Sequence, residues 1–558
     1  IRETFNISDA YGQYDGNNSN AQYLPRSEDG IHPDHHGLHA LNINLIDSTF
    51  NLLSTNDGGL YLSKSSKQPG HQDMDFEFVS SGYNSTQFYS ADKMPGENRY
   101  IGGMQDNGTY LTPQGETSNA STAFDFAIGG DGFEVLWNNR DPQKVIGSIY
   151  YNGFSVSSDG GVSWKTAQDG IIAQDGPFLS RLANSRSYPD RVYAISQNGI
   201  YISNNFGENW SLSSITSDAW VFSNYTDVEV SAADAKIIWA GGYMSEDSRL
   251  FISTDKGLTF TPTETYSDYP NMGPVTAIGS HPSDPNTAFA IFSLDGLPKI
   301  LKTEDLGQTW LDISGFDPAT GFSDRGFPNV ASHSFLCFPN NPDHIWVGTE
   351  IGIIETLNGG DSWALLNSNM PMVNIFDMKI QDDQVILATY GRGIWSVTIP
   401  EIEQEILFAP NIEQVSINPE GLTTIALSYS NLFDSTQVMV DDNVIHSVGT
   451  QDLGAVSLTL DNLSLNGMES IKTLAYKDGK SYESLESQVL LFEVFDVQTS
   501  YSTDFSVALD QLAFYGFKTG YESGFSNIAL HTTHPHPSSI ELISILKTPI
   551  QINETDAI

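Results

Sequence analysis

The chain has 558 residues, with 25 Lys and Arg against 69 Asp and Glu, which gives a formal net charge of −44. This charge disfavours nucleic acids and anionic membrane surfaces as partners, because both require a basic footprint. The single cysteine, Cys337, excludes an intrachain disulfide framework and cysteine-ligated zinc. No apolar run approaches the roughly 18 residues that a membrane span needs, and the first residues resemble a mature or excised start.

A short segment near the N-terminus holds the densest group of histidines. Its ligand-type residues are His32, Asp34, His35, His36 and His39. Imidazole and carboxylate groups bind transition metals, but alternation along a strand places His35 and His36 on opposite faces, so the five cannot all converge. We expect a structural or hydrogen-bonding role for the segment, keep metal binding as the alternative, and treat His35 and His36 as candidate ligand-binding residues.

Three acidic turns follow in the next hundred residues, at Asp57, Asp106 and Asp131. Glycine directly adjoins Asp57 and Asp131 and follows Asp106 by two residues, which lets the backbone turn tightly and exposes the carboxylate. An ionised Asp in such a turn usually accepts hydrogen bonds from the amides of its own turn. We therefore expect Asp57 and Asp131 to be tied up by their own backbone.

Between residues 157 and 363 one motif recurs five times, Ser/Thr-x-Asp/Asn-x-Gly-x-x-Trp/Phe, at intervals of about 50 residues. Its side chains suit a turn that follows a short apolar strand, with Asx and hydroxyl bonds to the backbone and an aromatic anchor. We expect all of them to be structural. They are Ser157, Asp159, Gly161, Trp164, Ser203, Asn205, Gly207, Trp210, Ser253, Asp255, Gly257, Phe260, Thr303, Asp305, Gly307, Trp310, Thr356, Asn358, Gly360 and Trp363.

The recurring motif resembles that of the Asp-box (BNR-repeat) β-propellers, which include sortilin-type receptors, xyloglucan-active glycoside hydrolases and sialidases. Short strands at this period indicate an all-β fold of propeller blades. Degenerate units on both sides extend the pattern, so we predict a propeller over residues 1–400 with seven or eight blades, or more if the chain is part of a larger ring.

After Pro400 the sequence changes character. Residues 401–494 alternate apolar and polar side chains between short turns, which predicts an immunoglobulin-like or fibronectin-like β-sandwich. Residues 495–558 resemble the start of a jelly-roll-like module of secreted bacterial proteins, shorter than such modules usually are.

The resemblance also bears on the acidic turns. Asp57 and Asp131 resemble the settings of the catalytic carboxylate pair of the xyloglucan-active family, and glycosidases need two carboxylates about 5–10 Å apart. That family closes its cleft with two propellers, however, and the sequence shows one. Arginine is scarce and no Phe/Tyr-Arg-Ile-Pro segment occurs, which excludes the sialidase arginine triad. Arg392, between two glycines, is the best anion-binding candidate.

Two functions remain open at this point. The first is a secreted or cell-surface recognition or adhesion protein of bacterial type, whose propeller binds a protein or polysaccharide through residues such as Asp106, Glu134 and Arg392. The second is an extracellular glycoside hydrolase or polysaccharide-binding protein that uses Asp57 and Asp131. These two functions leave open whether the protein is an enzyme, and we favour the first, which is not. No cofactor is dictated by the sequence, and Ca²⁺ in a loop of the ring is the ion we expect.

Overall fold

The computed structural model describes residues 31–32, 34–70, 75–461, 467–496, 512–515, 517–520, 529–532 and 543–547. In these residues the secondary structure is strands and two short 3-10 helices, η1 (Tyr150–Asn152) and η2 (Pro400–Ile402). No helix in the described ranges is long and apolar enough to span a bilayer. The chain divides into two compact units, residues 1–404 and 405–558.

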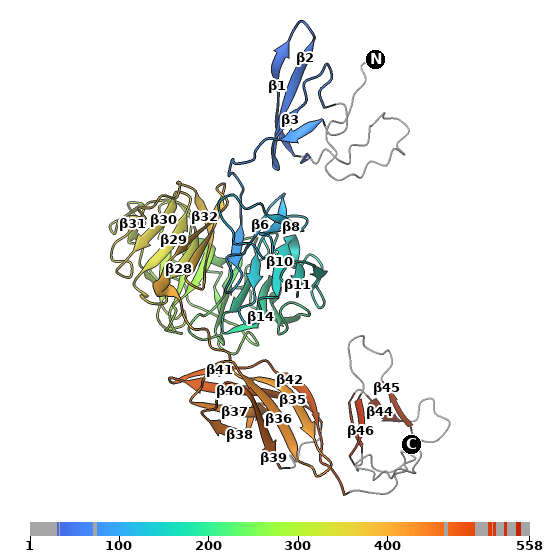
Figure 1. The fold of residues 1–558 in the computed structure, drawn as a ribbon. Helices are drawn as coiled ribbons and strands as arrows, with labels where there is room; N and C mark the ends of the chain where they lie inside the picture. Colours follow the sequence, from blue (N-terminus) through green and yellow to red (C-terminus); the bar gives the residue numbers. More distant parts are fainter. Residues whose placement is uncertain are drawn as a thin grey trace. The chain divides into compact units, whose positions relative to one another are not determined.

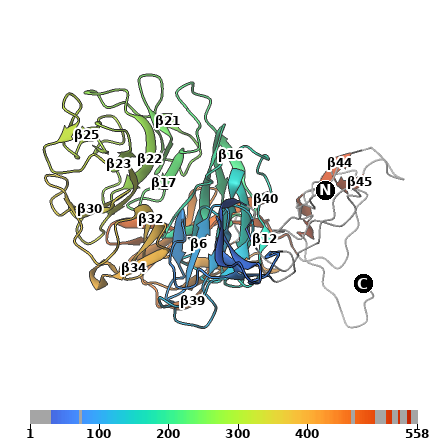
Figure 2. The ribbon, with the colours of Figure 1, turned by 90° about the horizontal axis from the view of Figure 1, so that it is seen from above.

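Seven antiparallel sheets of the first unit form a closed circuit (Figures 1 and 2). The first strand of each sheet contacts the first strand of the next, and the last of them returns to the first. In circuit order these strands are β5 (Ser90–Lys93), β9 (Val135–Trp137), β13 (Leu182–Ser185), β17 (Asp227–Val230), β22 (Gly273–Ser280), β28 (Ser332–Cys337) and β32 (Asn374–Gln381). Successive sheets around a common centre make this part of the chain a β-propeller.

The remaining strands of each sheet pair outward from the first. They are β6 (Tyr100–Met104), β7 (Gly108–Leu111) and β8 (Asp125–Ile128); β10 (Val145–Ile149), β11 (Gly153–Ser157) and β12 (Lys165–Thr166); β14 (Tyr188–Ser196), β15 (Gly199–Ser203) and β16 (Ser211–Ser214); β18 (Ile238–Gly241), β20 (Phe251–Ser253) and β21 (Thr261–Pro262); β23 (Ala288–Phe292), β24 (Ile300–Thr303) and β25 (Leu311–Asp312); β29 (Ile345–Thr349), β30 (Gly352–Thr356) and β31 (Ala364–Leu365); and β33 (Gln384–Tyr390) and β34 (Ile394–Thr398). The second strands are continuous apolar runs, as in β23, because neighbouring sheets cover both of their faces.

The ring closes between its first and last sheets. Phe88 donates its amide to the Thr389 carbonyl at 3.0 Å, and the Tyr100 hydroxyl donates to Gln384 Oε1 at 2.7 Å. The last sheet, β32 to β34, has three strands in the described residues, fewer than the other sheets of the circuit.

The first sheet of the chain has no place in this circuit. Its strands are β1 (His35–Asn44), β2 (Thr49–Asn56), β3 (Gly59–Ser63) and β4 (Phe76–Phe78). They pair in the order β1-β2-β3-β4, while β5 is already in contact with β32 and β33. Much of β1 is exposed, so it lacks the cover on both faces that a blade receives. The closed circuit of described strands therefore begins near residue 88, inside the range 1–400 that the sequence predicted for the propeller.

Two small elements are added to the ring. The strand β19 (Tyr243–Met244) extends the sheet of β22, and a hairpin of β26 (Phe316–Asp317) and β27 (Phe322–Ser323) is inserted between β25 and β28.

The second unit contains a β-sandwich (Figure 1). One sheet holds β35 (Asn411–Ile417), β36 (Thr423–Tyr429) and β39 (Gly454–Leu460), and the other holds β37 (Ser435–Val440), β38 (Asn443–Gly449), β40 (Gly467–Lys477), β41 (Lys480–Glu483) and β42 (Ser487–Leu491). Alternating residues such as Ile425, Leu427 and Val438 form one core between the sheets. This alternation is what predicted the sandwich.

Most of the segment expected to begin a jelly-roll-like module lies outside the described residues. The described part contains two strand pairs, β43 (Leu512–Tyr515) with β46 (Ile543–Leu546), and β44 (Phe517–Gly520) with β45 (Ala529–Thr532). The jelly-roll interpretation stays a prediction.

Candidate functional site

The three acidic turns meet. Asp106 lies in the turn between β6 and β7, and its amide donates to Asp131 Oδ1 at 3.0 Å. Asn107 donates its side-chain amide to the Asp57 carbonyl at 3.0 Å. Burial and the nearby carboxylates of Asp131 and Asp57 raise the pKa of Asp106. Asp106 thus lies between the two carboxylates that the sequence singled out.

The partners of these carboxylates differ from those we expected. In the Asp57 turn, the Gly58 amide donates to Asn56 Oδ1 at 3.0 Å, so Asn56 rather than Asp57 makes the Asx-type bond. Asp57 Oδ1 instead accepts a hydrogen bond from His36 Nε2, which raises the pKa of His36. Asp131 is held by the amide of Asp106 from the neighbouring turn. Each carboxylate is therefore bound, but by a residue distant in sequence.

The histidines separate as strand alternation predicts. His36 turns to Asp57, whereas His35 Nδ1 lies 2.8 Å from Ser54 Oγ on the other face of β1. Burial lowers the pKa of His35. His32 Nε2 lies 2.8 Å from the Asp106 carbonyl, so the histidine segment contacts the acidic turn of the ring.

Glu134, which the sequence offered as a ligand-binding residue, is buried beside the first strands. Its Oε1 accepts from Ser90 Oγ at 2.7 Å and from Lys379 Nζ at 2.6 Å, and its Oε2 lies 3.5 Å from Arg181 Nη1. Burial disfavours the ammonium of Lys379, but Asp377 and Glu134 outweigh this effect and raise its pKa. Glu134 belongs to an ion network that joins several blades, so its carboxylate is committed there.

Arg392 is exposed in the β33–β34 turn. Its guanidinium donates to the Gly391 carbonyl at 2.7 Å, and its own carbonyl accepts from Asn84 at 2.6 Å. The bonds in the structure fix the turn and leave the charged group at the surface.

Sequence analysis missed a group of aromatic side chains on the same side of the ring. Tyr89 packs against Phe133, Phe376 and Tyr390, with ring centroids 4.9–5.5 Å apart, and Phe133 packs against Phe178. The Tyr89 hydroxyl donates to Gln105 Oε1 at 3.0 Å, beside Asp106. The signal was present, because Tyr89, Phe133 and Phe376 are each followed by a polar or acidic residue that lies in an inner strand or directly before one.

Exposed tyrosines extend this aromatic group outward. Tyr150 and Tyr151 contact Phe178 and are 39% and 41% exposed. Tyr225 is 57% exposed and follows Asn224, whose side-chain oxygen accepts the Phe178 amide at 3.0 Å. Tyr151 has a φ of 57°, a left-handed conformation that is costly for a bulky residue. Such strain gathers at functional positions. We call Tyr89, Phe133, Tyr150, Tyr151, Phe178, Tyr225, Phe376 and Tyr390 the aromatic mouth.

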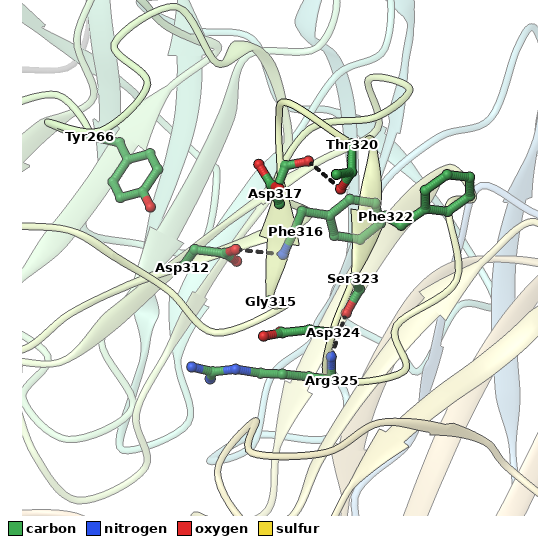
Figure 3. A pocket seen from close by; sticks show the side chains of 10 residues that line it. All are labelled: Tyr266, Asp312, Gly315, Phe316, Asp317, Thr320, Phe322, Ser323, Asp324 and Arg325. Carbon is green, nitrogen blue, oxygen red and sulfur yellow. Dashed lines mark hydrogen bonds between the residues drawn. The ribbon is translucent and has the colours of Figure 1, made fainter.

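A separate hollow of about 470 Å³ lies beside the inserted β26–β27 hairpin (Figure 3). Asp312 is buried there and accepts the Phe316 amide at 2.8 Å, and burial raises its pKa. Phe322 is 72% exposed, and Asp324 and Arg325 also line the hollow. None of the residues predicted from sequence as ligand-binding lies in it.

His32, Asp34 and Asp57 are the group best suited to a metal in the described part of the chain. Each offers one ligand atom, and the three atoms lie within 4.8 Å of one another.

No family model matches the sequence, and no curated protein matches it. Among solved structures, the GH74 enzyme of Niastella koreensis is 14% identical with a TM-score of 0.41, over 64% of this chain and 48% of the enzyme. The extracellular domain of the putative hybrid two component system BT3049 from B. thetaiotaomicron is 10% identical with a TM-score of 0.42, over 81% of this chain and 67% of that one. YCF48 from Cyanidioschyzon merolae is 13% identical with a TM-score of 0.34, over 53% of this chain and 92% of that one.

The chain spans about half the length of the Niastella koreensis enzyme. Identities and TM-scores this low carry no functional argument, and one propeller architecture serves many functions. The function has to be argued from the side chains.

Proposed function

We propose that this chain is an extracellular or cell-surface recognition protein of bacterial type, which binds a polysaccharide or protein ligand at the aromatic mouth and the adjoining acidic turns. The proposal rests on one observation: exposed tyrosines and carboxylates lie together on one side of the ring. Aromatic faces pack on sugar rings or apolar side chains, and carboxylate oxygens accept hydrogen bonds from hydroxyl or ammonium groups.

The bonding of the acidic turns supports recognition over hydrolysis. A glycosidase needs one carboxyl group that gives up a proton and a second that stays ionised. Asp57 faces the imidazole of His36, and Asp131 accepts an amide hydrogen bond. Each carboxylate thus serves as a hydrogen-bond acceptor for another group of the protein, which is the role of a binding group rather than of a proton donor.

Binding by the full chain to glycan arrays and to surface-protein extracts tests the proposal. Tyr225→Ala and Tyr150→Ala should each weaken binding about tenfold or more, as loss of an aromatic anchor does. Phe126→Ala is the matched control, because Phe126 is 62% exposed on β8, the outermost strand of its sheet. Equal losses in all three variants, or no loss in the tyrosine variants, would contradict a binding site at the mouth.

A glycoside hydrolase is the second candidate, and the raised pKa of Asp106 between Asp57 and Asp131 is the observation in its favour. A polysaccharide-hydrolysis screen distinguishes the two functions. Hydrolysis of a β-glucan or xyloglucan by the wild type, lost in Asp57→Asn or Asp131→Asn variants that remain folded, would replace recognition by catalysis.

A further inference from the structure

We propose that His32, Asp34 and Asp57 bind one divalent transition-metal ion at the end of the β1–β4 sheet nearest the acidic turn of Asp106. Ligands held at about 2.0–2.2 Å from one ion lie no more than about 4.4 Å from each other. The three candidate ligand atoms are within 4.8 Å of one another, so small side-chain rotations bring them around one centre.

The hydrogen bonds of His32 make Nδ1 the acceptor nitrogen of its ring. Its Nε2 lies 2.8 Å from the carbonyl oxygen of Asp106, which only accepts, so Nε2 carries the proton. The other ring nitrogen, Nδ1, then carries the electron pair. It accepts the Asp34 amide at 3.3 Å and lies 3.4 Å from Asp34 Oδ2, so a bound ion would take the place of the amide hydrogen bond. A metal-bound histidine is commonly held in this way, with its second nitrogen donating to a backbone carbonyl.

Asp57 is oriented by a comparable contact. His36 Nε2 donates to Oδ1 of Asp57 and leaves the other carboxylate oxygen available to an ion. Three acceptor groups, the His32 nitrogen and two carboxylates, thus converge from short segments on either side of β1 and β2. Acceptors that face each other repel unless a proton or a cation lies between them.

The surrounding charge favours a cation. The charged groups that act most strongly on Asp106 are Asp131, Asp57, His32 and Asp34, three aspartates and one histidine. One imidazole with two carboxylates suits zinc, manganese or cobalt rather than calcium, which prefers six to eight oxygen ligands. The His32 side chain is 12% exposed, while those of Asp57 and Asp34 are 27% and 60% exposed, so one side of the ion faces solvent.

Zinc titration of the chelator-treated, dialysed full chain tests the site by calorimetry, with metal content checked by elemental analysis. We expect one zinc ion per chain. His32→Gln and Asp57→Asn should abolish this binding step, and His36→Gln, which removes only the supporting hydrogen bond, should weaken it about 10–100-fold. The matched control is His39→Gln, which removes another exposed histidine of β1 and should bind zinc as the wild type does.

Cobalt supplies a second readout. The visible absorption of a bound cobalt ion should appear in the wild type and in His39→Gln and be absent in His32→Gln. Thermal unfolding of each variant without metal shows whether it folds, and Asp34→Asn replaces any variant that does not, because the Asp34 side chain lies largely in solvent. Zinc affinity unchanged in His32→Gln and Asp34→Asn, or no zinc binding by the wild type, would overturn the proposal.

Discussion

Glu229 is the residue whose ionisation should most affect stability. It lies on the inner strand β17, where burial and the nearby Asp227 and Asp377 raise its pKa to about 8, although Ser280 donates to it at 2.8 Å. Since the pKa of this acid is higher in the folded state than in the unfolded chain, its contribution to stability is complete below the unfolded value near 4.5 and is lost as the pH rises through about 8.

Urea unfolding of the wild type and of Glu229→Gln as a function of pH measures this loss. The variant keeps an oxygen acceptor for Ser280 but cannot ionise, so its stability relative to the wild type should rise by roughly 2–4 kcal/mol between about pH 5 and pH 8. The exposed residue Glu116 provides the control, and Glu116→Gln should follow the wild type. If the free energies of unfolding of the wild type and Glu229→Gln changed with pH in parallel, Glu229 would ionise as freely in the fold as in the unfolded chain.

The sequence identified residues well where their bonds are local. In the first copy of the repeated motif, Ser157 Oγ accepts the Gly161 amide at 2.8 Å and Asp159 Oδ1 accepts the Ser163 amide at 2.9 Å, and the other four copies repeat this arrangement. The partners of Asp57 and Asp131 come from other turns. Turn propensity describes a few neighbouring residues and holds no information on such contacts.

The tryptophans of the repeated motif differ in whether they connect neighbouring blades. Trp310 Nε1 donates to the Glu264 carbonyl of the preceding sheet at 2.9 Å, and its side chain is packed in a core with Trp239. Trp164 instead donates to Gly161 within its own turn and is only half-buried. The tryptophan of the motif therefore links two blades at Trp310, whereas at Trp164 its hydrogen bond stays within one turn.

Chemical unfolding of tryptophan variants should show this difference. Trp310→Ala should cost about 3–5 kcal/mol, because it removes a buried aromatic group and leaves a cavity. Trp310→Phe should cost less, mainly the lost hydrogen bond of about 1 kcal/mol, and Trp164→Ala should cost about 1–2 kcal/mol. Equal costs for the two alanine variants would mean that contacts between blades add nothing at Trp310.

The sequence predicted that the chain forms blades better than it predicted which sheets join the ring. The repeat interval and the apolar second strands correctly indicated blades, since each blade buries its middle strands between two neighbours. The turn at Asp57 looked like one more blade. Ring closure depends instead on packing between β5 and β32, which lie far apart in the chain, and this packing leaves β1 to β4 outside the circuit.

For the whole molecule, we expect residues 1–404 and 405–558 to fold independently, close to the boundary that the sequence placed at residue 400. The described core of the second unit extends from Leu407 to Leu491 and draws on no residue of the ring. Calorimetry of the two fragments and the full chain measures this. The fragments should each melt cooperatively at the midpoints seen in the full chain, and a fragment that fails to fold would contradict the division.

The net charge of −44 should make the stability of the molecule depend on salt. Like charges spread over a compact surface repel one another more than in the expanded chain, so part of the folding free energy opposes this repulsion. Salt shortens the range of the repulsion to about 10 Å at 0.1 M. The thermal midpoint should therefore rise with sodium chloride, by about 2–4 °C for each kcal/mol of repulsion removed.

Calcium separates general screening from specific binding, and His32→Gln is the appropriate chain for the experiment because it lacks the proposed transition-metal site. A divalent ion held by Asp carboxylates and backbone carbonyls stabilises the folded chain in proportion to the logarithm of its concentration over its dissociation constant. At constant ionic strength after chelation, calcium should therefore raise the midpoint further than magnesium does, since magnesium gives up its water ligands reluctantly. Identical midpoints with chelator, magnesium and calcium would leave screening as the whole effect and would contradict a structural calcium ion in the ring.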